Sequence, residues 1–160
     1  MHTAYLLTGT NLGERKKNLA DAAALIAAQC GQLTRLSSIY ETAAWGKTDQ
    51  PAFLNQAMEL KTMLNARQLI RHLLKIEKKM GRIREEKYGP RLIDIDILLF
   101  NNEVHDYEFL RLPHPELPNR RFALLPLAEI APDQIHPLLH LTVSGMLANC
   151  TDNLDVTIVS

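Results

Sequence analysis

The segment that decides the fold reads Gly89-Pro90-Arg91-Leu92-Ile93-Asp94-Ile95-Asp96-Ile97-Leu98-Leu99. Apolar and acidic residues alternate along it, and residues two apart in a β-strand share a face. We therefore predict a strand over residues 92–100. The isoleucines at 93, 95 and 97 would pack inward, while Asp94 and Asp96 project together from the other face.

Outward from this segment, the pattern predicts further strands over residues 3–8, 33–42, 53–61 and 155–159. Helices are predicted over residues 19–28 and 142–149, and the clearest helix begins after Asn65, which can cap it with Gln68 three positions on. Gly81 is placed to end that helix. Six prolines between 110 and 137 predict an irregular stretch with one helical turn near 124–129. This irregular alternation favours an α+β fold with a largely antiparallel sheet.

Length and composition limit the functions that the chain can have. Its 160 residues suit a single domain over 1–160, and 46% hydrophobic content allows a sizeable core. Eighteen basic and eighteen acidic side chains cancel, which argues against partners bound through a net basic field, namely nucleic acid or a membrane surface. No obligate protein partner is implied. With no visible signal peptide and two isolated cysteines, the expected location is cytoplasmic.

Asp94 and Asp96 are candidate metal ligands. Two residues along a strand place their backbones about 6–7 Å apart, a gap that carboxylates can close around hard cations. Magnesium prefers oxygen ligands and keeps phosphate and water in its shell. The alternative is an ordinary half-buried strand with a wet face. Aspartate is disfavoured in strands, however, and two neighbouring like charges repel unless something positive lies between them.

The loop before this strand is rich in arginine and is bracketed by Gly81 and Gly89. Arg82 and Arg84 lie at its start and Arg91 at its end. Phosphoryl transfer is catalysed mainly by alignment and charge neutralisation, for which the planar guanidinium is well suited. The loop could therefore close over a polyphosphate as a lid does. The alternative is a solvated connection whose surface charges cancel.

The segment from Lys87 to Leu98 closely resembles the signature of the hydroxymethyldihydropterin pyrophosphokinases. Other blocks resemble the same family in the same order along the chain. They are Gly9–Gly13, Tyr40–Thr42, Asp49–Pro51, Phe53–Asn55, Gly81–Arg84, Leu112–Pro115, Arg120–Phe122 and Glu129–Pro132. The resemblance implies a ferredoxin-like αβα sandwich and transfer of pyrophosphate from ATP to 6-hydroxymethyl-7,8-dihydropterin.

The resemblance also assigns roles near the phosphates. Asp94 and Asp96 would bind two Mg²⁺ ions that bridge the ATP phosphates, and Arg82 and Arg91 would assist the transfer. The remaining nucleotide contacts would come from Arg84 and Tyr88 of the lid, from His114 and Arg120 at the phosphates, and from Glu77 and Ile97 near the adenosine portion.

A pterin is flat and rich in hydrogen-bond donors and acceptors, so it needs stacking faces and amide-like partners. By the resemblance, its ring would lie between Phe122 and either Trp45 or Tyr88. The hydrogen-bonding edge of the pterin would be contacted by Asn55, Thr42 and the backbone of Ala43. Phe53 belongs to the same block and is either a substrate contact or plain core. Tyr88 stands where the family often has tryptophan, which leaves a smaller ring in the lid.

Two other classes of protein remain alternatives. The aspartate pair by itself also fits another two-metal phosphotransferase or nuclease, although residues 42–55 favour a pterin. A ferredoxin-like sheet can also bind nucleic acid through exposed aromatic residues. The neutral charge and the two aspartates on the exposed strand face argue against that second class.

Overall fold

A six-stranded sheet forms the centre of the molecule, seen here in a computed structural model that describes residues 1–42, 51–81 and 92–160. Its strands run in the spatial order β5-β1-β4-β3-β8, with β2 pairing the other part of β4, and every pairing is antiparallel. Their bounds are β1 (His2–Thr10), β2 (Gln32–Leu36), β3 (Tyr40–Thr42), β4 (Phe53–Thr62), β5 (Asp94–Phe100) and β8 (Val156–Ile158).

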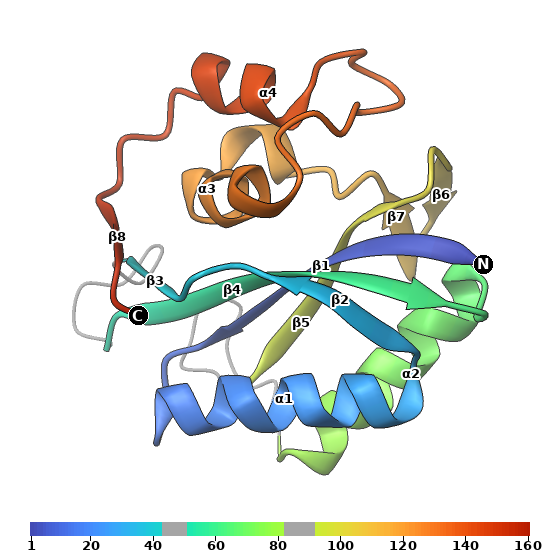
Figure 1. Cartoon of the computed structure of the whole chain (residues 1–160), viewed down its shortest axis with the longest axis vertical. Coiled ribbons are helices and arrows are strands. Elements are labelled where there is room, and N and C mark those ends of the chain that lie inside the picture. The colour runs from blue at the N-terminus through green and yellow to red at the C-terminus, as the bar shows by residue number, and fades with distance from the viewer. Residues whose placement is uncertain (43–50, 82–91) are drawn as a thin grey trace.

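Helices cover both faces of the sheet. α1 (Arg15–Gln29) and α2 (Ala66–Lys79) lie on one face, and α3 (Arg121–Ile130) and α4 (Val143–Asn149) lie on the other (Figure 1). A two-stranded hairpin of β6 (His105–Tyr107) and β7 (Leu110–Leu112) and a short 3₁₀ helix, η1 (Leu117–Asn119), connect β5 to α3. The arrangement is the predicted ferredoxin-like α+β sandwich.

The predicted helix after Asn65 is confirmed together with its cap. The Asn65 side chain accepts the Gln68 amide, and the Gln68 side chain accepts the Asn65 amide in return. This capping box satisfies two donors that the first turn would otherwise leave unpaired. The helix ends before Gly81, whose φ of +88° is a conformation that glycine adopts without strain.

Three of the sequence-based expectations were wrong in part. Residues 33–42 form two strands rather than one, and the hairpin strand β6 was not predicted. The proline-rich stretch contains the ten-residue helix α3 instead of a single turn, and Pro126 lies inside it. A proline inside a helix costs about 3 kcal/mol. Burial of each large apolar side chain gains roughly 1.5–3 kcal/mol, so the apolar face of α3 outweighs that cost. This face comprises Ala123, Leu124, Leu127 and Ile130.

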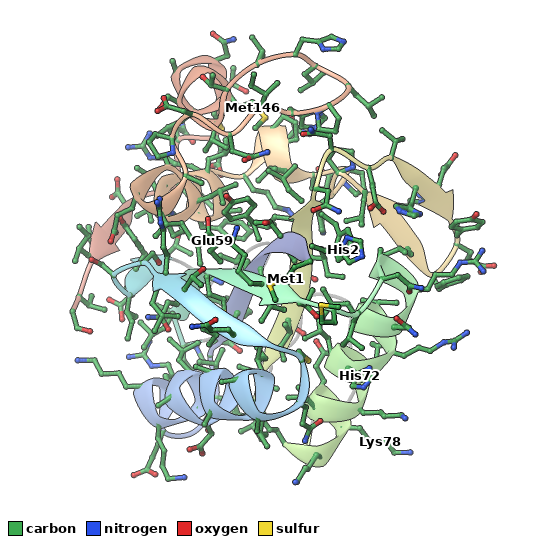
Figure 2. All side chains as sticks on the ribbon, turned by 45° about the vertical axis from the view of Figure 1, so that its right-hand side comes forward. Met1, His2, Glu59, His72, Lys78 and Met146 are labelled. Carbon is green, nitrogen blue, oxygen red and sulfur yellow. The ribbon has the colours of Figure 1, made fainter. Side chains whose placement is uncertain are left out.

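Each face of the sheet has its own hydrophobic core. The core beneath α1 and α2 contains the inward-facing isoleucines of β5, whereas the core beneath α3 and α4 is built on Leu7 and Ala57. Figure 2 shows Glu59 on the α3 side of the sheet and Met146 on α4. Burial raises the pKa of Glu59, but hydrogen bonds from Thr34 and Tyr5 outweigh it and hold that pKa below its ordinary value.

His136, between α3 and α4, predicts a pH dependence of stability. It is buried, and its Nδ1 accepts the amides of Leu138 and Leu139 at 3.2 and 3.1 Å. Burial first, and then the charge of His140, lower its pKa below 6.5. The unfolded chain therefore binds this proton more readily than the folded chain does. The contribution of His136 to the free energy of unfolding is fully present above pH 6.5 and is lost as the pH falls through the folded pKa.

We expect the free energy of unfolding to fall between pH 6.5 and 5.5, with at most about 1.4 kcal/mol per pH unit from this one group. Urea denaturation at both values would measure the fall, and His136→Gln should reduce it. The control His140→Gln alters an exposed neighbour and should keep most of it. An unchanged pH dependence in His136→Gln would contradict the assignment.

No helix among the described residues combines the length and the apolar character that crossing a bilayer requires.

Candidate active site

Asp94 and Asp96 occupy the face of β5 that the sequence predicted. Both are half-buried, whereas Ile93, Ile95 and Ile97 between and beside them are at most 4% exposed. In the register with β1, Asp94 lies opposite Gly9 and Asp96 opposite Leu7. Directly opposed residues share a face, and Leu7 packs under α3, so both aspartates are on the α3 side of the sheet.

The strand register brings the predicted pterin residues onto the same face. Asn55 of β4 lies opposite Gly9 of β1, which is itself opposite Asp94. Because β4 and β5 flank β1, the backbones of Asn55 and Asp94 are about 10 Å apart. Phe53, two residues before Asn55, points to the same side and pairs with Thr42 of β3. One face thus carries carboxylates at one edge and amide and hydroxyl groups further across.

Asn55 presents a buried acceptor without a protein partner. Its Nδ2 donates to the Thr8 carbonyl at 3.3 Å, which fixes the orientation of the amide. Among the described residues, Asn55 Oδ1 is the one buried side-chain oxygen or nitrogen that has no hydrogen bond. Leaving such a group unpaired costs about 1–3 kcal/mol. The atom is therefore suited to accept a hydrogen bond from a ligand donor.

Gly9 provides the space that Asn55 occupies. A Cβ atom at residue 9 would lie 2.5 Å from Asn55 Nδ2. No side chain fits there unless the amide moves. The predicted strand over residues 3–8 stopped short of Gly9, so this contact was not predicted, although the place of Gly9 at the start of the Gly9–Gly13 block was a signal.

Thr42 and Phe53 flank Asn55. Thr42 is buried, and its hydroxyl donates to the Asp155 carbonyl at 3.0 Å, so its oxygen can act toward a ligand only as an acceptor. Phe53 is half-buried at the start of β4. Tyr40 was not among the predicted site residues. It lies opposite Asn55, and its hydroxyl donates to Glu129 of α3 at 2.6 Å, which ties β3 to that helix.

The outer edge of β5 carries three of the predicted nucleotide residues. The carboxylate of Glu77, at the end of α2, accepts the Ile95 amide at 2.7 Å. The backbone amide of His114 donates to the Leu98 carbonyl at 3.0 Å. Ile97 lies between these two attachments, so Glu77, Ile97 and His114 follow one another along the same edge.

A cavity of about 380 Å³ opens beside this edge. Apolar side chains from α2 and β7 form much of its wall, and Asp96 and His114 supply polar groups. Its lining includes Ile70, Asp96, Ile97, Leu110, Leu112 and His114, and also the charged residues Glu108 and Arg111. An apolar slot with a carboxylate and an imidazole in its wall is a suitable site for a flat heteroaromatic ring attached to an anionic tail.

His114 is held as a neutral imidazole. Burial lowers its pKa below 6.5, the charge of Arg120 adds to this effect, and the carboxylates of Asp96 and Glu116 oppose it. Its Nδ1 accepts the Glu116 amide at 3.1 Å, which places the ring proton on Nε2. At neutral pH the ring can therefore donate a hydrogen bond to a ligand without contributing charge.

Arg120 and Phe122 stand at the start of α3. Arg120 is the residue just before the helix, and its guanidinium carbon lies 5.6 Å from the centre of the Phe122 ring. Phe122 is partly buried against the α3 core. Arg120 thus flanks, and Phe122 belongs to, the helix that covers the aspartate-bearing face.

Six predicted site residues lie outside the described part of the chain. They are Ala43, Trp45, Arg82, Arg84, Tyr88 and Arg91. Their roles stay predictions.

The donor set fits magnesium better than a metal that needs a complete protein cage. Within residues 1–42, 51–81 and 92–160, no group of three or more histidine, cysteine or carboxylate side chains could hold an ion. Two carboxylates on one strand face leave coordination positions open. Mg²⁺ characteristically fills such positions with phosphate oxygens and water.

Comparisons with known proteins are consistent with this geometry. A family model for 7,8-dihydro-6-hydroxymethylpterin-pyrophosphokinase matches residues 5–132. A 2-amino-4-hydroxy-6-hydroxymethyldihydropteridine pyrophosphokinase of Bacillus subtilis is 47% identical over 128 residues, which are 79% of this chain and 77% of the relative. A protein of the same name from Aquifex aeolicus is 41% identical over 138 residues, 86% of each chain.

Solved structures with the same fold are more distant in sequence. The HPPK-DHPS triple mutant of Plasmodium falciparum with pteroate superposes with a TM-score of 0.73 at 18% identity. The match covers 92% of this chain and 43% of the Plasmodium chain, so this chain spans less than half of that protein. At this identity the likeness shows the fold alone.

Proposed function

The chain belongs to the 7,8-dihydro-6-hydroxymethylpterin-pyrophosphokinase family, and from this premise we propose how its own residues carry out the reaction. The enzyme transfers pyrophosphate from ATP to 6-hydroxymethyl-7,8-dihydropterin in folate biosynthesis. Family membership decides against both alternatives weighed above, the nucleic-acid module and the unrelated two-metal enzyme.

The observation that carries the proposed site is the single sheet face shared by Asp94, Asp96 and Asn55. We assign the adenosine portion of ATP to the cavity at the outer edge of β5, beside Ile97, with His114 of the same cavity toward the phosphates. Asp96 lines that cavity and also faces α3, so the phosphates would run from the cavity onto the carboxylate-bearing face. The pterin then lies further across the sheet, toward β4.

The pterin donors match the unsatisfied acceptor of Asn55. The 2-amino group and the ring N–H of a pterin both donate hydrogen bonds, and Asn55 Oδ1 is buried and lacks a donor. Phe122 of α3 supplies a ring above this face. Thr42, Phe53 and Ala43 complete the substrate side of the proposal, with Trp45 or Tyr88 as the second stacking ring.

The reaction needs alignment more than covalent chemistry by the protein. The hydroxymethyl oxygen attacks the β-phosphorus of ATP, the bond from that phosphorus to the α–β bridging oxygen breaks, and AMP leaves while the hydroxyl proton is lost to solvent. Two Mg²⁺ ions held by Asp94 and Asp96 would supply positive charge at the phosphate oxygens. Arg82 and Arg91 would stabilise charge on the transferred group, with His114 and Arg120 as further phosphate contacts and Arg84 in the lid.

The mode of transfer can be tested with ATP radiolabelled on its β-phosphate. We expect the label to appear on the pterin, with one AMP released for each pterin pyrophosphate formed. Label on the α-phosphate is the matched control and should remain in AMP. Accumulation of labelled ADP would instead mean transfer of a single phosphoryl group and would refute the assignment.

We also propose that residues 1–160 act as one domain and that the enzyme works in the cytoplasm. The elements after residue 132 support the first proposal, because α4 contributes to the core under α3 and β8 pairs with β3. Two free cysteines, Cys30 and Cys150, support the second, because thiols stay reduced in the cytoplasm.

A further inference from the structure

Glu77 is a buried carboxylate that hydrogen-bonds to the protein backbone. It lies in the last turn of α2 and is 5% exposed. Its Oε2 accepts the backbone amide of Ile95 at 2.7 Å. Ile95 is the residue between Asp94 and Asp96, so Glu77 is attached to the backbone midway between the two proposed metal ligands.

The geometry of an antiparallel edge strand explains why this attachment matters. Successive residues of such a strand point their backbone groups alternately toward the partner strand and away from it. β5 is the edge strand next to β1, and the Ile95 amide points away from β1 to Glu77. Asp94 and Asp96 lie opposite Gly9 and Leu7 of β1. The segment is thus held by β1 on one side and by Glu77 on the other.

We propose that Glu77 is a positioning residue that fixes the backbone between Asp94 and Asp96 and thereby sets the spacing of the two carboxylates. This inference rests on the proposed function, in which those carboxylates bind Mg²⁺. It differs from the adenosine contact that the sequence suggested, because the donor found for the Glu77 carboxylate is the backbone amide of Ile95, within the protein itself.

The placement of Glu77 in α2 supports a dedicated role. A negative charge in the last turn of a helix is unfavourable, since the C-terminal end of the helix dipole is itself negative. Lys78 and Lys79, in the same turn, have the sign that this end favours. A buried glutamate here needs compensating partners, and the short hydrogen bond from the Ile95 amide is one of them.

Supports of this kind have measurable consequences at metal sites. Mg²⁺ requires nearly ideal geometry, so a small change in carboxylate spacing weakens its binding. Loss of a group that orients metal ligands typically reduces metal affinity or activity by about 10- to 100-fold. The effect should appear in the Mg²⁺ dependence of the rate, which a general loss of stability would leave unchanged.

The experiment compares Glu77→Met with Glu77→Gln. Methionine keeps the length and burial of the side chain but accepts no strong hydrogen bond, whereas glutamine keeps an acceptor oxygen and removes the charge. We measure the Mg²⁺ concentration that gives half the maximal rate at saturating ATP and pterin. Glu77→Met should raise this concentration about tenfold, and Glu77→Gln should stay close to the wild type.

The matched control is Leu73→Ala, one turn earlier on the same helix and fully buried. It should lower thermal stability while leaving the Mg²⁺ dependence unchanged. If Glu77→Gln is as impaired as Glu77→Met, the charge is what matters and the positioning role is overturned. A rise in the half-maximal Mg²⁺ concentration of Leu73→Ala equal to that of Glu77→Met would overturn it as well.

Hydrogen exchange of the unliganded wild-type enzyme tests the attachment without any variant. The Ile95 amide should exchange more slowly than the β8 amides that point away from β3. Equally rapid exchange would overturn the inference even if Glu77→Met fails to fold. An Asp96→Ala enzyme that remains active would instead refute the metal assignment, so the two failures are distinguishable.

Discussion

An Asp96→Ala enzyme is expected to lose at least 10³-fold in turnover at any Mg²⁺ concentration, which corresponds to about 4 kcal/mol of transition-state stabilisation. Asp96 lines the nucleotide cavity and also belongs to the face that carries Asp94 and Asn55. It is therefore the residue at which the nucleotide and the metal ligands meet. Removing its carboxylate leaves Asp94 alone opposite a highly charged triphosphate.

The same substitution should not weaken the fold. Two like charges side by side on a strand repel, so relief of that repulsion offsets the interactions lost with the Asp96 carboxylate, and the variant should unfold near the wild-type urea concentration. Asp96→Asn keeps the size of the side chain and should be nearly as inactive, because a neutral amide is a poor Mg²⁺ ligand. The exposed Asp133 provides the control, and Asp133→Ala should be fully active. Steady-state assays would check each variant, and normal turnover by Asp96→Ala would disprove the assignment.

A Gly9→Ala enzyme is expected to fold and to bind ATP but to bind the pterin roughly 10- to 100-fold more weakly, a loss of about 1.4–2.8 kcal/mol. The added Cβ would lie 2.5 Å from Asn55 Nδ2, the end of a side chain that can move. Once displaced, the amide loses its bond to the Thr8 carbonyl, and Oδ1 no longer has a fixed direction. The substitution should therefore weaken pterin binding and leave ATP binding unchanged.

Calorimetric titration with the pterin, in the presence of a non-hydrolysable ATP analogue and Mg²⁺, would measure the loss. Asn55→Ala should show a loss of similar size, and the double variant should lose little more than either single one, because both act on one group. Gly145→Ala in α4 is the matched control for the substitution itself. If Gly9→Ala binds the pterin normally, the orientation of Asn55 does not depend on Gly9.

The parts of the fold that could be predicted from sequence are those specified locally. Alternation of isoleucine with Asp94 and Asp96 gave the correct face of β5, because a period of two is a property of the strand itself. The cap at Asn65 was predictable for the same reason, since both of its hydrogen bonds join residues three apart. Helix α3 was predicted as a single turn because the prolines around it argued against a longer helix locally, while long-range burial favoured one.

The contacts that define the site depend on strand register, which a single sequence does not reveal. Gly9 and Asn55 are far apart in the chain, and only the pairing of β1 with β4 places one against the other. Glu77 reaches the Ile95 amide because α2 packs beneath β5 and ends beside its outer edge. Resemblance identified Glu77 and Asn55 as functional. It could not show that Glu77 binds the backbone of β5 or that Asn55 carries an unsatisfied acceptor.

The pairing of β8 with β3 has a consequence for engineering. The family match ends at residue 132, yet β8 hydrogen-bonds to the strand that ends in Thr42, and the Thr42 hydroxyl is fixed by Asp155. The end of the family match is therefore not the boundary of the unit that must be exchanged. A chimera that grafts the first 132 residues onto another relative's tail would leave the substrate strand with a mismatched neighbour, and recombination points should be chosen outside this pair.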